Sequence, residues 1–131
     1  MRVKFDTKEK FTVITPDESV ITANMSEALR QACEERLAGM PKSVVLNLQP
    51  VNMIEDEAAT TIAQVQQKFY EASSSFVVCG MNNNLEQAFE KLELLEFLNY
   101  TPTESEAWDI VQMEEIEREL LDSDDIEFET E

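Results

Sequence analysis

The 131-residue sequence contains no histidine, only two glycines and only two cysteines. Without histidine, the chain lacks the commonest general base, the Ser-His-Asp and Cys-His catalytic arrangements and a principal zinc ligand. The two glycines, Gly39 and Gly80, are too few and too far apart for a Walker loop or a dinucleotide-binding fingerprint. These absences exclude the common nucleophilic hydrolases and nucleotide-binding motifs. We therefore expect a protein that is not an enzyme and that holds no cofactor and no metal.

Long hydrophobic runs are also absent from the sequence. No apolar run approaches the ~18 residues that a membrane-spanning helix needs, and residues 1–5 lack the long apolar stretch of a secretory signal. Cys33 and Cys79 lie far apart within apolar patterns, which favours two small buried side chains over a disulfide. We expect a cytoplasmic protein that makes no membrane contact.

Basic residues are scarce, since ten Lys and Arg stand against 28 Asp and Glu, for a formal net charge of −18. Residues 114–131 contain ten acids and one base, Arg118, and so carry −9 of that charge. Such a chain repels phosphate, which argues against nucleic acid as a partner. Residues 122–131 carry too much charge to pack into a core. We expect one domain over residues 1–121, followed by a disordered acidic tail.

Short apolar runs alternate with amphipathic stretches along the chain. Residues 2–6 and 11–15 are rich in β-forming residues on either side of a charged turn and predict a hairpin. Residues 43–48 and 75–80 are continuous apolar runs, typical of strands covered on both faces. The alternation predicts an α/β domain that is parallel in its central part. A brief strand is expected over residues 19–22, and four helices over residues 25–38, 57–72, 85–92 and 105–121.

Three consecutive acids, Glu55, Asp56 and Glu57, come directly before the second predicted helix. The positive end of a helix stabilises an acidic side chain by about 0.3–1 kcal/mol, and three adjacent acids exceed what it needs. Neighbouring helical residues diverge by about 100°, so this stretch alone cannot surround a Mg²⁺ or Ca²⁺ ion. We interpret the trio as an exposed partner-reading surface, to which the preceding Asn52 and Met53 contribute.

Asn82, Asn83 and Asn84 follow the second buried run, where α/β proteins often hold ligands. A polar turn with Asn84 as the N-cap of the third helix is the simpler interpretation, and the loop stays a candidate ligand or contact site. In the same way, Asn24 is the predicted N-cap of the first helix, with Glu27 completing a capping box.

The order of these segments resembles a known domain. Two opening strands, a helix and the run VLNLQPVNMI (45–54) leading into a helix resemble the STAS domain, found in bacterial anti-sigma-factor antagonists and in the tails of sulfate transporters. The segment SFVVCGMNNNLEQAFEKLELLEFL (75–98) resembles the family's next strand, loop and helix, and TPTESEAWDIV (101–111) its closing helix. The resemblance spans roughly residues 2–112. It implies a small mixed β-sheet with about four helices packed against it.

The resemblance also gives the acid trio a meaning. After the corresponding strand, the family carries Asp-Ser-Ser/Thr-Gly-Leu, and a partner anti-sigma factor that is itself a kinase phosphorylates the first serine. In this sequence Glu55 falls on the Asp, Asp56 on the acceptor serine, Glu57 on the second hydroxyl residue, and Ala58 and Ala59 on Gly-Leu. In the family, the unmodified serine leaves a neutral surface that binds the partner, and the phosphate ends binding by repulsion and desolvation. A carboxylate has no hydroxyl to phosphorylate. The resemblance therefore implies a regulatory, non-catalytic module that binds an anti-sigma factor or a related signalling protein, with its switch fixed near the charged setting.

Two other functions are compatible with the sequence. The chain can be a scaffold that pairs with another STAS protein and uses its acidic tail as a second contact. It can also be a metal-dependent phosphoacceptor or enzyme that uses Asp56, although neither a converging metal site nor the usual nearby lysine can be placed. Phosphorylation at another position is a further alternative, for which the candidate hydroxyls are Thr60, Thr61, Ser73, Ser74 and Ser75.

Overall fold

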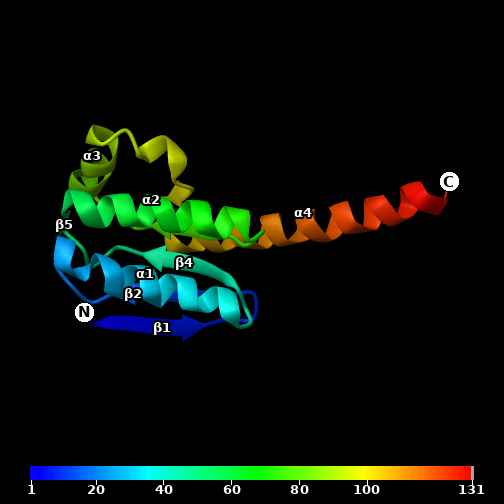
Figure 1. Cartoon of the computed structure of the whole chain (residues 1–131), viewed down its shortest axis with the longest axis horizontal. Coiled ribbons are helices and arrows are strands. Elements are labelled where there is room, and N and C mark those ends of the chain that lie inside the picture. Colours follow the sequence, from blue (N-terminus) through cyan, green and yellow to red (C-terminus); the bar gives the residue numbers. More distant parts are fainter. Residues whose placement is uncertain (131) are drawn as a thin grey trace.

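The computed structural model describes the backbone of residues 1–130 and the side chains of residues 1–121, and it alternates strands with helices (Figure 1). The strands are β1 (Val3–Thr7), β2 (Phe11–Pro16), β3 (Val20–Ile21), β4 (Ser43–Asn47), β5 (Met53–Ile54), β6 (Phe76–Cys79) and β7 (Tyr100–Thr101). The α-helices are α1 (Ser26–Glu34), α2 (Asp56–Glu71), α3 (Asn83–Lys91) and α4 (Glu104–Thr130). Short 3-10 helices are η1 (Ala23–Met25), η2 (Glu35–Ala38) and η3 (Leu95–Phe97).

Five strands form one mixed sheet in the order β1-β2-β4-β6-β7. The opening hairpin is antiparallel, as predicted, and the other neighbours run parallel. The strands β3 and β5 form a separate parallel pair, in which Val20 lies opposite Met53. This mixed sheet with four α-helices confirms the predicted α/β fold class.

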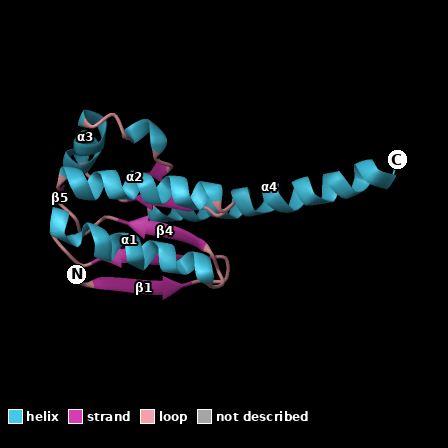
Figure 2. Cartoon of the chain, in the orientation of Figure 1, coloured by secondary structure: helices cyan, strands magenta, loops and turns pink. Residues whose placement is uncertain are grey.

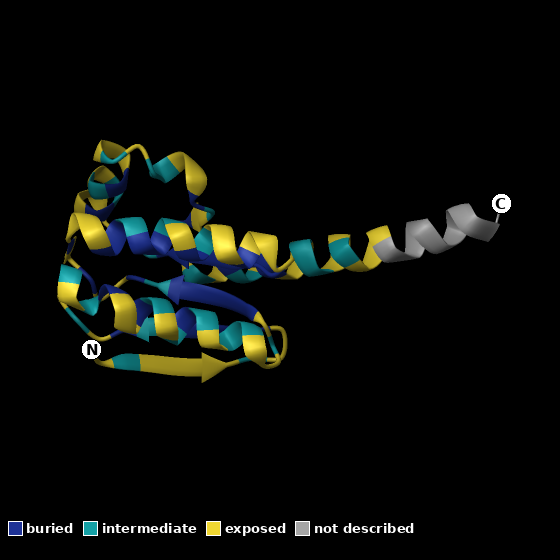
Figure 3. Ribbon diagram, viewed as in Figure 1, coloured by how far each residue is buried: buried dark blue, intermediate teal, exposed yellow. Residues whose placement is uncertain are grey.

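Helices cover both faces of the sheet, so β6 and all of β4 except Asn47 are buried (Figures 2 and 3). Successive side chains of a strand point to opposite faces, so Ile14 and Leu46 pack in the larger core, which contains residues of α1, α2 and α3. Val45 and Val77 pack in a smaller core against α4. Because helices cover both faces of the sheet, β4 and β6 are continuous apolar runs in the sequence.

The two cysteines lie in different cores, Cys33 in the larger and Cys79 in the smaller, and both are buried and free. Burial, and to a smaller extent a neighbouring acid, raises the pKa of each thiol to about 12; the acid is Glu34 for Cys33 and Glu104 for Cys79. The prediction of two buried, unpaired thiols is confirmed.

The predicted cap of the first helix is wrong. Asn24 lies inside η1, α1 begins at Ser26, and no side chain caps it. Glu27 takes no part in a capping box, and its carboxylate lies 3.7 Å from the Nε of Arg30. The 3-10 turn η1 follows β3 after a single residue, Thr22. Asn24 therefore lies inside this turn and not at the N-cap of α1, which is Met25.

The C-terminal part of the fold departs from the predictions in two further places. The two-residue strand β7 lies where a connection was expected, and it is too short to leave a period in the sequence. The last helix, predicted over residues 105–121, runs from Glu104 to Thr130 as α4. The side chains of residues 122–131 are not described, so the domain boundary at residue 121 and the disordered acidic tail stay predictions. In the part of the chain that the structure describes, no helix is long and apolar enough to cross a membrane.

Candidate partner-binding site

The acid trio and the asparagine loop belong to one end of the sheet. β4 and β6 are adjacent and parallel, so the segments that leave their carboxyl ends emerge side by side. The Nδ2 of Asn82, after β6, donates to the backbone carbonyl of Asn52, after β4, over 3.4 Å. The structure thus joins the two segments that the sequence analysis singled out separately.

The three acids occupy the N-terminal end of α2, as predicted. Glu55 is the N-cap, with extended backbone at φ −80° and ψ 156°, and Asp56 and Glu57 form the first turn. All three are exposed, whereas Ile54 and Ala58 on either side are buried. The buried neighbours fix the start of the helix, so the acids are held at its end. Their role in partner binding stays a prediction.

Glu55 differs from the other two acids because its side chain is used within the fold. Its Oε1 accepts a hydrogen bond of 2.6 Å from the N–H of Ala23, at the start of η1. Its own N–H donates to the carbonyl of Ile21 over 2.9 Å. Glu55 therefore ties the start of α2 to the end of β3. Sequence reasoning missed this role, since the two partners lie 32 residues apart.

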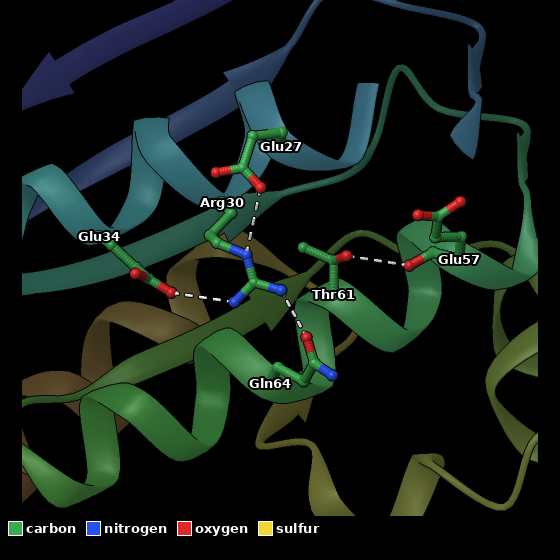
Figure 4. Close-up of polar contacts among 6 residues, drawn as sticks. All are labelled: Glu27, Arg30, Glu34, Glu57, Thr61 and Gln64. Atoms are coloured by element: carbon green, nitrogen blue, oxygen red, sulfur yellow. Dashed lines mark hydrogen bonds and ion pairs between the residues drawn. The ribbon is translucent and has the colours of Figure 1, made fainter. Parts of the chain in front are cut away.

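Asp56 and Glu57, by contrast, have no side-chain counter-charge: among the described residues, no lysine or arginine nitrogen lies within 4.0 Å of either carboxylate. The neighbouring helix α1 carries Arg30, but this guanidinium is used by Glu34 at 3.4 Å, by Glu27 and by Gln64 of α2 (Figure 4). The positive end of α2 is the remaining source of stabilisation for the pair. Two formal negative charges therefore face solvent at this helix end.

The hydroxyls nearest to the trio are poorly placed for modification. Thr61 is 5% exposed, and its Oγ1 donates to the carbonyl of Glu57 over 3.0 Å (Figure 4). Thr60 is half-buried. Of the later serines, Ser74 and Ser75 are buried and only Ser73 is exposed. A kinase that reached Thr61, Ser74 or Ser75 would first have to open the fold.

Two exposed apolar residues lie on the strand pair that leads into the acids. Met53 is 59% exposed, and its neighbour across the strand pair, Val20, is 36% exposed. Met53 could be predicted from the sequence, whereas Val20 could not, because the pairing of β3 with β5 is long-range. Asn52 is exposed as well, and its Nδ2 donates to the Oγ of Ser19 over 3.1 Å; its part in partner binding stays a prediction. The exposed side chains of this site therefore divide into Glu55 and Asn52, which are hydrogen-bonded within the fold, and Val20, Met53, Asp56 and Glu57, which remain for a partner.

The asparagine loop is explained by the fold itself. Asn82, and not Asn84, caps α3, and its Oδ1 accepts from the N–H of Leu85 over 2.9 Å. The helix begins two residues earlier than predicted because Asn83 and Asn84 take its first turn. Both oxygen and nitrogen of the Asn82 amide are thus used, and the ligand interpretation of this loop stays a prediction.

A close backbone crossing supports this end of the sheet. Gly80 has a positive φ of 78°, and a Cβ there would lie 3.0 Å from the Oδ1 of Asn47 and 3.0 Å from the N of Gln49. That Asn47 oxygen accepts from the N–H of Gln49, and the Asn47 Nδ2 donates to Glu104 over 2.9 Å. Glycine is therefore required where β6 leaves the sheet.

Metal binding finds no support in this geometry. Throughout the described residues, no group of three His, Cys, Asp or Glu side chains converges on a point where an ion could sit. The trio itself diverges, because Glu55 turns to Ala23 while Asp56 and Glu57 face solvent.

Solved structures share this architecture. An anti-sigma factor antagonist from Mycobacterium paratuberculosis is 18% identical, with 85% of this chain and 93% of that one covered at a TM-score of 0.73. An anti-sigma-factor antagonist (STAS) domain protein from Planctomyces limnophilus is 14% identical, with 84% and 97% covered at 0.72. The phosphorylated form of the Bacillus cell fate determinant SpoIIAA is 12% identical, with 84% and 99% covered at 0.62.

Among curated proteins, no sequence matches this chain. The three structural likenesses, at such low identity, show a shared fold. The sequence model of the STAS domain matches residues 2–107, which is most of the chain, so this protein belongs to the STAS domain family, as the order of its segments predicted.

Proposed function

We propose that this chain is a non-catalytic regulatory module that binds a protein partner through the N-terminal end of α2. The partner class that fits the family is an anti-sigma factor or a related kinase-type signalling protein. Structures named anti-sigma factor antagonists share the fold, and one such fold exists in a phosphorylated form. These likenesses support a regulatory role without naming the partner.

The observation that carries the proposal is the pair of uncompensated carboxylates, Asp56 and Glu57, in the first turn of α2. A phosphoserine adds about −1.5 to −2 charge at neutral pH. The two carboxylates together supply a formal −2 at the position where the family pattern has its phosphoacceptor serine. The chain therefore presents permanently the charge that a serine-containing relative would acquire only after modification.

The proposal predicts that a kinase cannot set this switch. No hydroxyl lies between Asn52 and Ala59, and Thr61, the buried threonine one turn on, donates its hydroxyl to Glu57. The test is incubation of the folded chain with ATP and a serine kinase of the anti-sigma-factor class, followed by peptide mass spectrometry. We expect no phosphate within residues 52–61.

The matched control is the double variant Asp56→Ser/Glu57→Ser, which restores hydroxyls on the same helix end. This variant should accept phosphate at residue 56 under the same conditions, which shows that the kinase recognises the fold. Phosphate on Thr60 of the unaltered chain would contradict the proposal, because the switch would then have moved by one turn rather than become fixed.

A further inference from the structure

The last described turns of α4 carry an apolar stripe that the fold does not use. Met113, Ile116 and Leu120 are 58%, 54% and 56% exposed, and they recur at spacings of three and four residues. That spacing places them on one side of the helix. Ala107 and Val111, which are 0% exposed, define the side that packs on the sheet. At about 100° per residue, the stripe lies on the side of α4 that faces away from the sheet.

The helix that carries this outer stripe (Met113, Ile116 and Leu120) is anchored to the domain. The Nη2 of Arg118 donates to the Oγ of Ser75 over 3.2 Å, and the Nδ2 of Asn99 donates to Glu114 over 3.4 Å. In Figure 3 the described part of α4 runs past the end of α2, so its outer side is open to a large partner. The outer stripe is therefore an accessible surface on a helix that is fixed to the domain.

The charges around the outer stripe select its occupant. Glu117 and Glu119 flank it, and both are exposed. Asp109, one turn before Met113 on the same side, is exposed as well. The sequence over residues 114–131 carries a net charge of −9. A second copy of the chain would bring these charges against their own kind, which disfavours self-association.

We propose that the outer stripe docks a basic amphipathic helix of another protein. Apolar side chains of that helix would cover Met113, Ile116 and Leu120, and its lysines or arginines would lie against the flanking acids, as in other helix-to-helix recognition. This contact is separate from the surface at the start of α2 and does not depend on it. The chain would thus hold two partner surfaces on different elements.

The test uses three labelled peptides of about three heptads each. The first has Leu at the a and d positions and Lys at e and g; the second replaces each Lys by Glu; the third shuffles the first so that no apolar stripe remains. Fluorescence anisotropy measures the binding of each to the full chain at about 50 mM and about 300 mM salt. The variant is Ile116→Gln/Leu120→Gln, and the matched control is Phe97→Gln, whose side chain is 62% exposed on η3.

We expect the lysine peptide to bind most tightly, with weaker binding at high salt. The double variant should weaken this binding by at least about tenfold, and Phe97→Gln should leave it unchanged. Equal binding of the shuffled or the glutamate peptide would overturn the proposal, as would an unaffected double variant. Sedimentation equilibrium should find the chain monomeric; a dimer that the double variant abolishes would assign the stripe to a second copy and overturn the proposed occupant.

Discussion

Replacing Glu55 by alanine should destabilise the domain, although the residue belongs to an exposed acidic cluster. The change removes the carboxylate that accepts from the N–H of Ala23 over 2.6 Å. An intramolecular hydrogen bond typically contributes about 0.5–1.5 kcal/mol to stability. Ala23 is half-buried, so water replaces part of the lost bond, and we expect about 1 kcal/mol. In a domain of this size that is a fall of about 4 °C in the midpoint of thermal unfolding.

The adjacent acids are the matched controls for this prediction. Asp56→Ala and Glu57→Ala each remove a charge that the helix end stabilises by about 0.3–1 kcal/mol, but each also relieves repulsion within the trio. Their net effect should stay within about 0.5 kcal/mol. Glu55→Gln keeps an acceptor oxygen and should lose less than Glu55→Ala. Thermal unfolding followed by circular dichroism would refute the reasoning if Glu55→Ala melted with the unaltered chain, or if all three alanine variants lost equally.

Two further changes test the support of the site and the predicted domain end. Gly80→Ala places a Cβ against Asn47 and Gln49 at positive φ, so it should lower the free energy of unfolding by about 2 kcal/mol and lower the urea midpoint. At Gly39 an added Cβ meets no atom within 4 Å, so Gly39→Ala should be nearly neutral. Equal urea midpoints for the two variants would contradict the backbone argument. Deleting residues 122–131 should hold or raise the thermal midpoint because the net charge falls in magnitude, and a drop of more than about 5 °C would mean that this segment packs on the domain.

The fold could be predicted because its signals are local and repeated. The runs at β4 and β6 are apolar without interruption, as sheets covered on both faces require, and the period after Ala58 places the start of α2 within one residue. The prediction failed where a few residues decide the structure through distant contacts. The cap expected from Asn24 is absent because η1 intervenes, and the two residues of β7 form a strand through pairing with β6.

The candidate site could be predicted in its position and only partly in its composition. Helical periodicity predicted that the acids lie at a helix end, and the structure confirms this position at the start of α2. Glu55 differs from Asp56 and Glu57 because it accepts a hydrogen bond from Ala23, and this bond joins two distant segments of the chain. The same holds for Val20, which reaches the site through the pairing of β3 with β5. Such contacts leave no pattern within a single stretch of sequence.

In the proposed function, Asp56 and Glu57 hold the surface at the start of α2 permanently at its charged setting. The measurement that tests it most directly is calorimetric titration of the unaltered chain and of Asp56→Ser/Glu57→Ser against one anti-sigma-type partner captured from native lysate, at low and high salt. We expect the double variant to bind more tightly by more than about tenfold, because a like-charge cost of several kcal/mol is removed. Weaker binding by the double variant, with a loss that shrinks at high salt, would contradict the account and make the acids a contact for a basic partner. Equal affinity of the two proteins would mean that Asp56 and Glu57 do not contribute to the binding surface.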